Sequence, residues 1–157
     1  MPNTPVTLVI LGASGDLTHR LLLPGLGTLL RAKDSFDLHL VGAAFDDLDD
    51  AAWRQRVREA LAEGGCSGEK AERMASETRF EHIDVTDVDA MRAFLAELAA
   101  EGRPIVLYFA LPPAISEKAC EALTQIDLPE GLRLAIEKPF GTNLESAQEL
   151  NRLLTRL

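Results

Sequence analysis

Short apolar runs alternate with longer amphipathic stretches along this chain. The first run, residues 7–11, consists of apolar or β-branched residues and predicts a buried strand. Similar runs predict further strands at residues 37–42, 79–85, 105–110 and 132–137. Between them, apolar residues recur at helical spacing, which predicts helices at about residues 17–30, 50–63, 69–77, 87–101 and 115–126, and a last one from residue 142. This alternation predicts an α/β fold, a doubly wound parallel sheet with helices on both faces and right-handed crossovers.

Three local features refine these predictions. Pro24 falls inside the first helix, where a proline costs roughly 3 kcal/mol, so we expect a kink or break there, or a second helical segment that Pro24 opens. Thr86 is expected to cap the helix that follows it, and Thr142 and Glu145 have the spacing of a capping box. The run at 105–110 is continuously apolar, so its strand is expected to be buried on both faces.

The composition narrows the class of protein. The 157 residues suffice for one domain with a real core, and 46% of them are hydrophobic. A net charge of −9 argues against broad binding to nucleic acid or to anionic membranes. Two cysteines build no disulfide or metal framework, so we expect a reducing, cytoplasmic location and no metal site. The N-terminus lacks the basic region of a signal peptide, and no apolar stretch is long enough to span a bilayer.

The unusual residues of the chain collect where strands end. In a doubly wound sheet, ligands bind at the carboxyl ends of the strands, near the point where strand order reverses. A strand, a glycine turn and a helix present backbone N–H groups and a positive helix end to a phosphate. We therefore predict a Rossmann-type nucleotide site from four loops: Gly12-Ala13-Ser14-Gly15, residues 43–47, Leu111-Pro112-Pro113 and residues 137–141.

The glycine turn carries the phosphate prediction. Gly12 allows a tight turn and Gly15 allows close approach to a pyrophosphate, while Ser14 adds a hydroxyl donor. The spacing is only Gly-x-x-Gly, because Thr18 stands where a third Gly or Ala belongs. The alternative is a glycine-rich turn that binds no ligand. Asp16, at the helix start, is expected to cap the helix, because a carboxylate beside a phosphate is repulsive.

Two further positions bear on the cofactor. After the second strand, an acidic side chain accepts hydrogen bonds from a ribose 2′-hydroxyl, whereas an arginine accommodates a 2′-phosphate. Phe45 is followed by Asp46 and Asp47, which favours NAD over NADP unless these carboxylates only serve the N-terminus of the next helix. Lys138 follows a strand, where it could bind a phosphate or a sugar hydroxyl, or pair with Glu137 as a surface lysine.

Four stretches together resemble one family, the glucose-6-phosphate 1-dehydrogenases. Their order and spacing match along the chain: residues 12–18 with Pro24, Tyr108-Phe109-Ala110-Leu111-Pro112-Pro113, Glu137-Lys138-Pro139-Phe140-Gly141, and Leu144-Glu145-Ser146-Ala147 with Leu150-Asn151. The Glu-Lys-Pro-Phe-Gly run is the specific one, whereas the glycine turn is shared widely. The resemblance implies binding of NADP, or in some members NAD, and oxidation of glucose 6-phosphate to 6-phosphogluconolactone, the first step of the pentose phosphate pathway.

The resemblance also implies roles for individual residues. Ala110, Leu111 and Pro112 would line the nicotinamide side of the cofactor. Lys138 would contact both substrate and cofactor. The cofactor phosphates would lie against the first loop and the helix start, formed by Gly12, Ala13, Ser14, Gly15, Asp16 and Leu17.

Two positions depart from the family pattern. Phe45 stands where an arginine is usual, with Asp46 after it, which leans towards NAD in place of the family's default NADP. Leu21 stands where a basic residue is usual, which removes part of the expected substrate contact. The family is also much longer, with a second α+β domain that carries the catalytic histidine. We find no base in this chain to take the proton of the substrate hydroxyl, so no catalytic residue is assigned.

These observations support one main hypothesis of function. Residues 1–157 would form the dinucleotide-binding domain of a glucose-6-phosphate dehydrogenase, inactive alone, with glucose 6-phosphate bound only when the second domain is present. The alternative is a non-catalytic NAD(P)-sensing or interaction module. A short-chain dehydrogenase is set aside, because those enzymes need a lysine four residues after a tyrosine, and Tyr108 has Pro112 there. A domain without its partner domain should expose an apolar patch, so we expect formation of a homo-oligomer or poor solubility.

Overall fold

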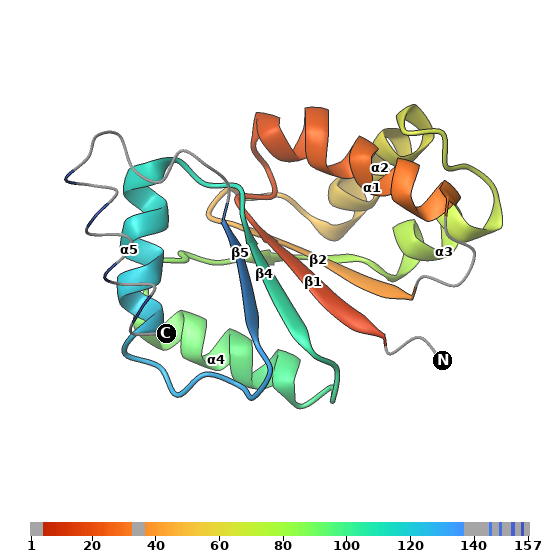
Figure 1. Ribbon diagram of the computed structural model, residues 1–157. Helices are drawn as coiled ribbons and strands as arrows, with labels where there is room; N and C mark the ends of the chain where they lie inside the picture. The colour runs from red at the N-terminus through yellow and green to blue at the C-terminus, as the bar shows by residue number, and fades with distance from the viewer. Residues whose placement is uncertain are drawn as a thin grey trace.

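A parallel five-stranded sheet runs through the described part of the chain (Figure 1). The computed structural model describes residues 5–32 and 37–136, and four separate residues near the C-terminus: Glu145, Gln148, Arg152 and Thr155. The strands lie in the order β3-β2-β1-β4-β5. They are β1 (Val6–Leu11), β2 (Leu38–Ala44), β3 (Arg79–His82), β4 (Ile105–Phe109) and β5 (Arg133–Ile136). The chain builds outward from β1 to β3 and then returns to the other side of β1, so the strand order reverses between β1 and β4.

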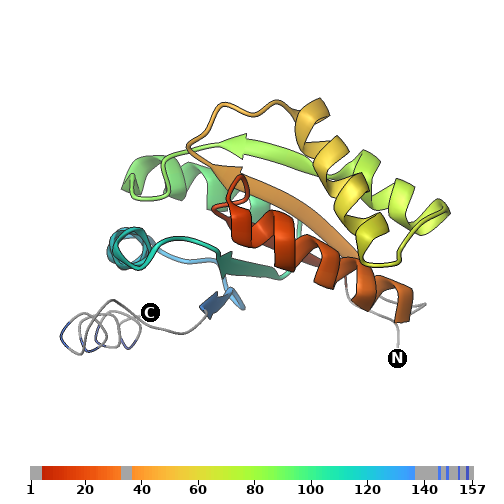
Figure 2. The same ribbon diagram turned by 90° about the horizontal axis from the view of Figure 1, so that it is seen from above.

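Helices cover the sheet from both sides (Figure 2). One face carries α1 (Leu23–Ala32), α2 (Asp50–Glu63) and α3 (Glu69–Glu77), and the other carries α4 (Val88–Ala99) and α5 (Pro113–Leu123). Side chains alternate along a strand, so the two faces of the sheet have separate cores. Ile10 of β1 joins the first core, against α1, α2 and α3, while Val9 and Leu11 join the second core, against α4 and α5. All three are at most 2% exposed. The predicted doubly wound α/β fold is confirmed.

Trp53 of α2 packs directly against β2 in the core between the sheet and α1, α2 and α3. Its ring is fully buried, and a Cβ added to Gly42 of β2 would lie 2.7 Å from it. The indole N–H donates a hydrogen bond of 2.9 Å to the Thr78 hydroxyl, which donates in turn to the carbonyl of Leu40 at 2.7 Å. A buried indole needs such a partner, because an unpaired buried donor destabilises the fold.

The first predicted helix runs without a break through residues 16–32, and it contains a π-helical turn just before Pro24, where a kink or break was expected. A short π-helix, η1 (Thr18–Leu22), precedes α1, in which Pro24 is the second residue. The N–H of Leu23 donates to the carbonyl of Thr18, five residues back. Proline has no N–H to donate, so the wider turn accommodates the missing hydrogen bond and the chain continues directly into α1.

Several predicted boundaries need correction. The helices at 50–63 and 69–77 have the predicted limits, but β3 ends at His82, because the chain beyond it turns. The side chain of Asp87, not of Thr86, caps α4 by accepting from the N–H of Ala90 at 3.1 Å. The hydroxyl of Thr86 is already bonded to Asp84. α5 begins two residues earlier and ends three residues earlier than the prediction of 115–126.

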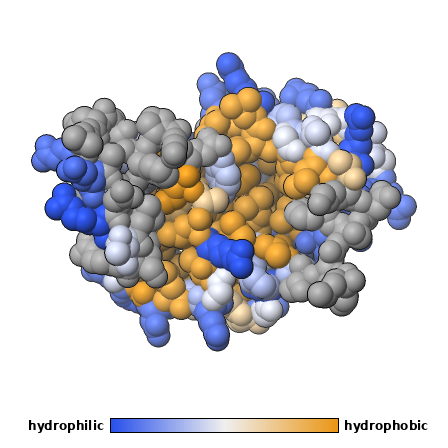
Figure 3. Space-filling view, in the orientation of Figure 1, coloured by the Kyte–Doolittle hydropathy of each residue, from blue (hydrophilic) through white to orange (hydrophobic). Residues whose placement is uncertain are grey.

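The prediction that β4 is buried on both faces is wrong. Ile105, Leu107 and Phe109 are buried against α4 and α5, but the alternate residues are only half-buried. On that side lies a shallow groove of about 300 Å³, lined by Leu8, Ile10, Leu21, Leu22, Gly25, Leu26, Leu29 and Tyr108. Figure 3 shows apolar side chains gathered over β1, β4 and β5 on this face. An exposed apolar surface was expected, and this is its place in the fold.

The last predicted helix and the Lys138 loop lie outside the described residues, apart from four positions. Glu145, Gln148, Arg152 and Thr155 are helical and exposed. Nothing further bears on Thr142 as a cap. Among the described helices, none is both long and apolar enough to cross a membrane.

Candidate functional site

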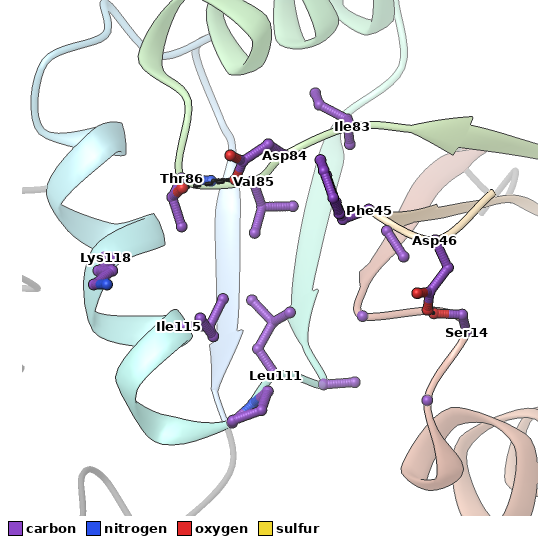
Figure 4. A pocket seen from close by; sticks show the side chains of 15 residues that line it. Ser14, Phe45, Asp46, Ile83, Asp84, Val85, Thr86, Leu111, Ile115 and Lys118 are labelled. Atoms are coloured by element: carbon purple, nitrogen blue, oxygen red, sulfur yellow. Dashed lines mark hydrogen bonds between the residues drawn. The ribbon is translucent and has the colours of Figure 1, made fainter.

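An open cavity of about 490 Å³ lies at the carboxyl ends of the strands, where the strand order reverses (Figure 4). It brings together residues from the loops after β1, β2, β3 and β4 and from α5. Eight of the sequence-predicted residues line it: Gly12, Ser14, Gly15, Phe45, Asp46, Ala110, Leu111 and Pro112. Ala13, Asp16 and Leu17 do not, and Lys138 is outside the described residues.

Gly12 is required by the close approach of two loops. Its φ is +90°, and an added Cβ would collide with the backbone carbonyl of Ala110. The N–H of Ala110 donates to the carbonyl of Leu11 at 2.9 Å, which holds the two loops side by side. The buried hydroxyl of Thr18 donates to the carbonyl of Gly12 at 3.2 Å. Thr18 therefore steadies the turn by a hydrogen bond where the common fingerprint has a third small residue.

Not every N–H of the turn is available to a phosphate. Those of Gly12 and Ala13 both donate to the carbonyl of Ala43, at 2.8 and 3.2 Å, and that of Gly15 donates to Gly12 at 3.1 Å. Within the part of the chain that the structure describes, the backbone N–H groups of Ser14, Asp16 and Leu17 have no backbone hydrogen-bond partner. They precede η1, so they sit at the positive end of a helical segment.

Two predicted residues thus contribute differently from expectation. The side chain of Ala13 is 2% exposed and packs in the core beside α1 and α2. Asp16 makes no capping hydrogen bond among the described residues, so the structure does not support its predicted capping role. Its backbone N–H, together with that of Leu17, is the group that can face a phosphate.

The carboxylate of Asp46 is held beside the glycine turn. The hydroxyl of Ser14 donates to it across 32 positions of sequence (Figure 4). The sequence left open whether Asp46 and Asp47 merely serve the N-terminus of the next helix. Asp49 is the residue that caps α2, accepting from Ala52 at 2.7 Å. Asp46 is therefore free for the cavity, whereas Asp47 does not line it.

Phe45 forms an exposed aromatic wall of the cavity. Its side chain is 72% exposed, and its ring makes an edge contact with His82, with ring centres 5.6 Å apart. The ring faces the loop after β3, where Asp84 and Thr86 line the same cavity. An exposed aromatic at this edge offers a flat surface on which a base could stack.

The sequence missed one end of the cavity. Its lining there comes from the loop after β3 and from α5: Ile83, Asp84, Val85, Thr86, Ile115 and Lys118. The rule that ligands bind at strand ends could have found Asp84, which lies at the carboxyl end of the third predicted strand. Nothing local could have found Ile115 and Lys118, which reach the cavity only because α5 packs beside β4. The Thr86 hydroxyl and N–H hold the pKa of Asp84 below its usual range.

The chemistry of the cavity suits a dinucleotide. Within the described ranges, no group of three or more His, Cys, Asp or Glu side chains could hold a metal ion. Free N–H groups at a helical N-terminus suit a pyrophosphate, and an acidic residue after β2 suits a ribose hydroxyl. With this strand order, these features define the class of Rossmann-type dinucleotide-binding domains.

Comparison with known families identifies the family within this class to which the chain belongs. A family model described as "Glucose-6-phosphate dehydrogenase, NAD binding domain" matches residues 9–157. The chain belongs to this family, as the resemblance predicted, and a nicotinamide dinucleotide is the cofactor that the family name carries.

Similar proteins agree with this assignment. A glucose-6-phosphate 1-dehydrogenase of Mycolicibacterium smegmatis is 35% identical, over 96% of this chain and 32% of its own length. One of Dickeya dadantii is 33% identical, over 92% of this chain and 30% of its own. The crystal structure of the Mycobacterium avium enzyme has a TM-score of 0.76 at 30% identity, covering 97% of this chain and 34% of that one. This chain spans about a third of the length of these relatives.

Proposed function

We propose that this chain is the cofactor-binding domain of a glucose-6-phosphate dehydrogenase. The parent enzyme would transfer a hydride from glucose 6-phosphate to a nicotinamide dinucleotide and release 6-phosphogluconolactone, the first step of the pentose phosphate pathway. The observation that carries the proposal is the cavity in which the glycine turn and Asp46 meet at the switch point of the sheet. A similar solved structure, with a TM-score of 0.78, is described as glucose-6-phosphate dehydrogenase in complex with its substrate.

The cofactor would lie across the carboxyl edge of the sheet. Its pyrophosphate would accept hydrogen bonds from the N–H groups of Ser14, Asp16 and Leu17, which have no other backbone partner within the described residues. Asp46 would accept from the adenosine ribose. Ala110 and Pro112 would flank the nicotinamide half, which accepts the hydride when the cofactor is bound. The predicted role of Lys138 at the substrate side remains part of this proposal.

We further propose that NAD is preferred over NADP. Asp46 is fixed by Ser14, so its charge cannot easily swing away from a 2′-phosphate. Phe45 occupies the exposed position beside it and offers no cation. Lys118, the one basic residue in the described lining, projects from α5 on the opposite wall (Figure 4).

The isolated chain is expected to bind cofactor without turning over substrate. Hydride transfer requires a base for the substrate hydroxyl. Among the described residues, His39 lies near Glu77 on the amino-terminal half of β2, and His82 lies against Phe45. His19 lies in η1 and takes part in no described side-chain hydrogen bond. None of the three lines the cavity to which Ala110 and Pro112 belong.

Two measurements test the proposal. Calorimetric titration of the chain with NAD and with NADP should detect binding of at least one of them. No detectable binding of either at millimolar concentration would refute the cofactor role. An assay with glucose 6-phosphate and the binding cofactor should give no turnover, and substantial activity would refute the argument from the missing base. A non-catalytic NAD(P)-sensing or interaction module would show the same binding. Sequencing of the parent gene distinguishes the two hypotheses, because a reading frame that ends at Leu157 supports the module and one that continues supports the domain of a longer enzyme. A cytoplasmic location and a homo-oligomer remain predictions, for cell fractionation and sedimentation to test.

A further inference from the structure

The end of the cavity farthest from the glycine turn is an apolar slot with a carboxylate at its rim. Ile83, Val85, Leu111 and Ile115 supply aliphatic surface, and the Phe45 ring stands across from them (Figure 4). A slot with a flat aromatic wall and aliphatic opposite walls suits a planar heterocycle. Polar groups there decide which heterocycle is accepted.

Asp84 is the carboxylate of this slot, and its geometry is fixed by the turn after β3. One oxygen, Oδ1, accepts from both the N–H of Thr86 at 2.9 Å and the Thr86 hydroxyl at 2.6 Å. Within the described part of the chain, the other oxygen, Oδ2, has no hydrogen-bond partner. Because these two bonds also lower the pKa of Asp84, its carboxyl stays ionised near neutral pH and can only accept hydrogen bonds.

The other acidic group of the cavity lies outside the slot. Asp46 receives the Ser14 hydroxyl at the opposite end, beside the glycine turn. Lys118 also lines the slot, and its ammonium group can only donate. The slot therefore offers one fixed acceptor, Asp84, and one flexible donor, Lys118. A base that presents an amino group satisfies the fixed group, whereas a base that presents a carbonyl oxygen there meets a negative charge.

We propose that Asp84 recognises the 6-amino group of a purine, so that the cavity selects adenine dinucleotides over 6-oxopurine dinucleotides. This rests on the proposed function, because it assumes that the dinucleotide lies in this cavity with its pyrophosphate at the glycine turn. Phe45 provides the stacking surface and is indifferent to the substituent. Asp84 is a specificity-determining residue and takes no part in hydride transfer.

The test compares two cofactors that differ at one position. NAD carries adenine, and nicotinamide hypoxanthine dinucleotide carries a carbonyl oxygen in place of the amino group. Loss of a hydrogen bond to a charged group should weaken binding of the hypoxanthine analogue to the wild-type chain roughly 10- to 100-fold, measured by calorimetry. Equal affinities, or tighter binding of the hypoxanthine analogue through Lys118, would overturn the proposal without any variant.

Asp84→Asn supplies the second readout. The amide oxygen can still accept from Thr86, while the amide N–H₂ can donate to a 6-oxo group, so the preference for NAD should vanish or reverse. Asp89→Asn removes the same charge from a side chain of α4 that is 92% exposed and does not line the cavity, and it should keep the wild-type preference. An Asp84→Asn chain that retains that preference contradicts the inference. Wild-type chain that binds neither dinucleotide refutes the proposed function itself, and the inference with it.

Discussion

The charge of Asp46 should decide between NAD and NADP, and Asp46→Asn tests this with little structural disturbance. The variant keeps an oxygen that can accept from the Ser14 hydroxyl, so the loop after β2 should hold its position. What changes is one negative charge at the place where a 2′-phosphate would lie. The control is Asp47→Asn. It removes an identical charge at the next residue, whose side chain does not line the cavity.

The expected magnitude follows from the exposure of the site. Two unit charges 4 Å apart interact by about 1 kcal/mol in water and about 4 kcal/mol at an effective dielectric constant of 20. Asp46 is exposed, so the water-like end of this range applies, and a phosphate with a charge near −2 meets a repulsion of about 2 kcal/mol. Replacing a charged acceptor by a neutral one also weakens the bond to the NAD ribose by about 1 kcal/mol. Together these changes shift the ratio of NAD to NADP affinity by roughly 100-fold towards NADP.

The assay is a titration of each chain with both dinucleotides at low and moderate salt. Asp47→Asn should shift the ratio several-fold less than Asp46→Asn, and added salt should shrink the NADP penalty of the wild type. Equal shifts in the two variants would mean that only the overall charge matters. An unchanged ratio in Asp46→Asn would refute the role of Asp46 altogether.

Three further predictions concern stability, each measured by urea unfolding of the isolated chain. Gly12→Ala should destabilise the fold more than Gly102→Ala, because both have a positive φ but only the first directs a Cβ into backbone, and equal losses would contradict the collision. Trp53→Phe should cost about 1–3 kcal/mol by leaving the Thr78 hydroxyl without its donor, and a change within error would show that this bond contributes nothing. The stabilising contribution of the ionised Asp84 is complete above its ordinary pKa of about 3.9 and is lost as pH falls through its lowered folded-state pKa. Asp84→Asn should therefore flatten the acid side of the stability profile, and an unchanged profile would argue against the Asp84–Thr86 bonds.

Local patterns accounted for most of the fold. The helices at 50–63 and 69–77 have their predicted limits, because Gly64 and Gly65 end the first and Gly68 precedes the second. The local change from α- to π-helical hydrogen bonding before Pro24 follows from the missing N–H of proline, whatever the rest of the chain does. The strand at 79–85 was overestimated, since Ile83 and Val85 continue the apolar alternation into a turn and face the same core.

The sequence by itself determined the succession of strands and helices along the chain and the loops that carry the site. Periodicity, glycines and strand ends are properties of neighbouring residues. Only the tertiary structure decided which groups of those loops remain available. It shows that the N–H groups of Gly12 and Ala13 donate to the carbonyl of Ala43 in β2, and that the Ser14 hydroxyl donates to Asp46. It also shows that Asp84 closes a cavity with residues of α5. These are contacts between segments distant in the chain, and only the packing of the sheet and its helices brings such segments within hydrogen-bonding distance.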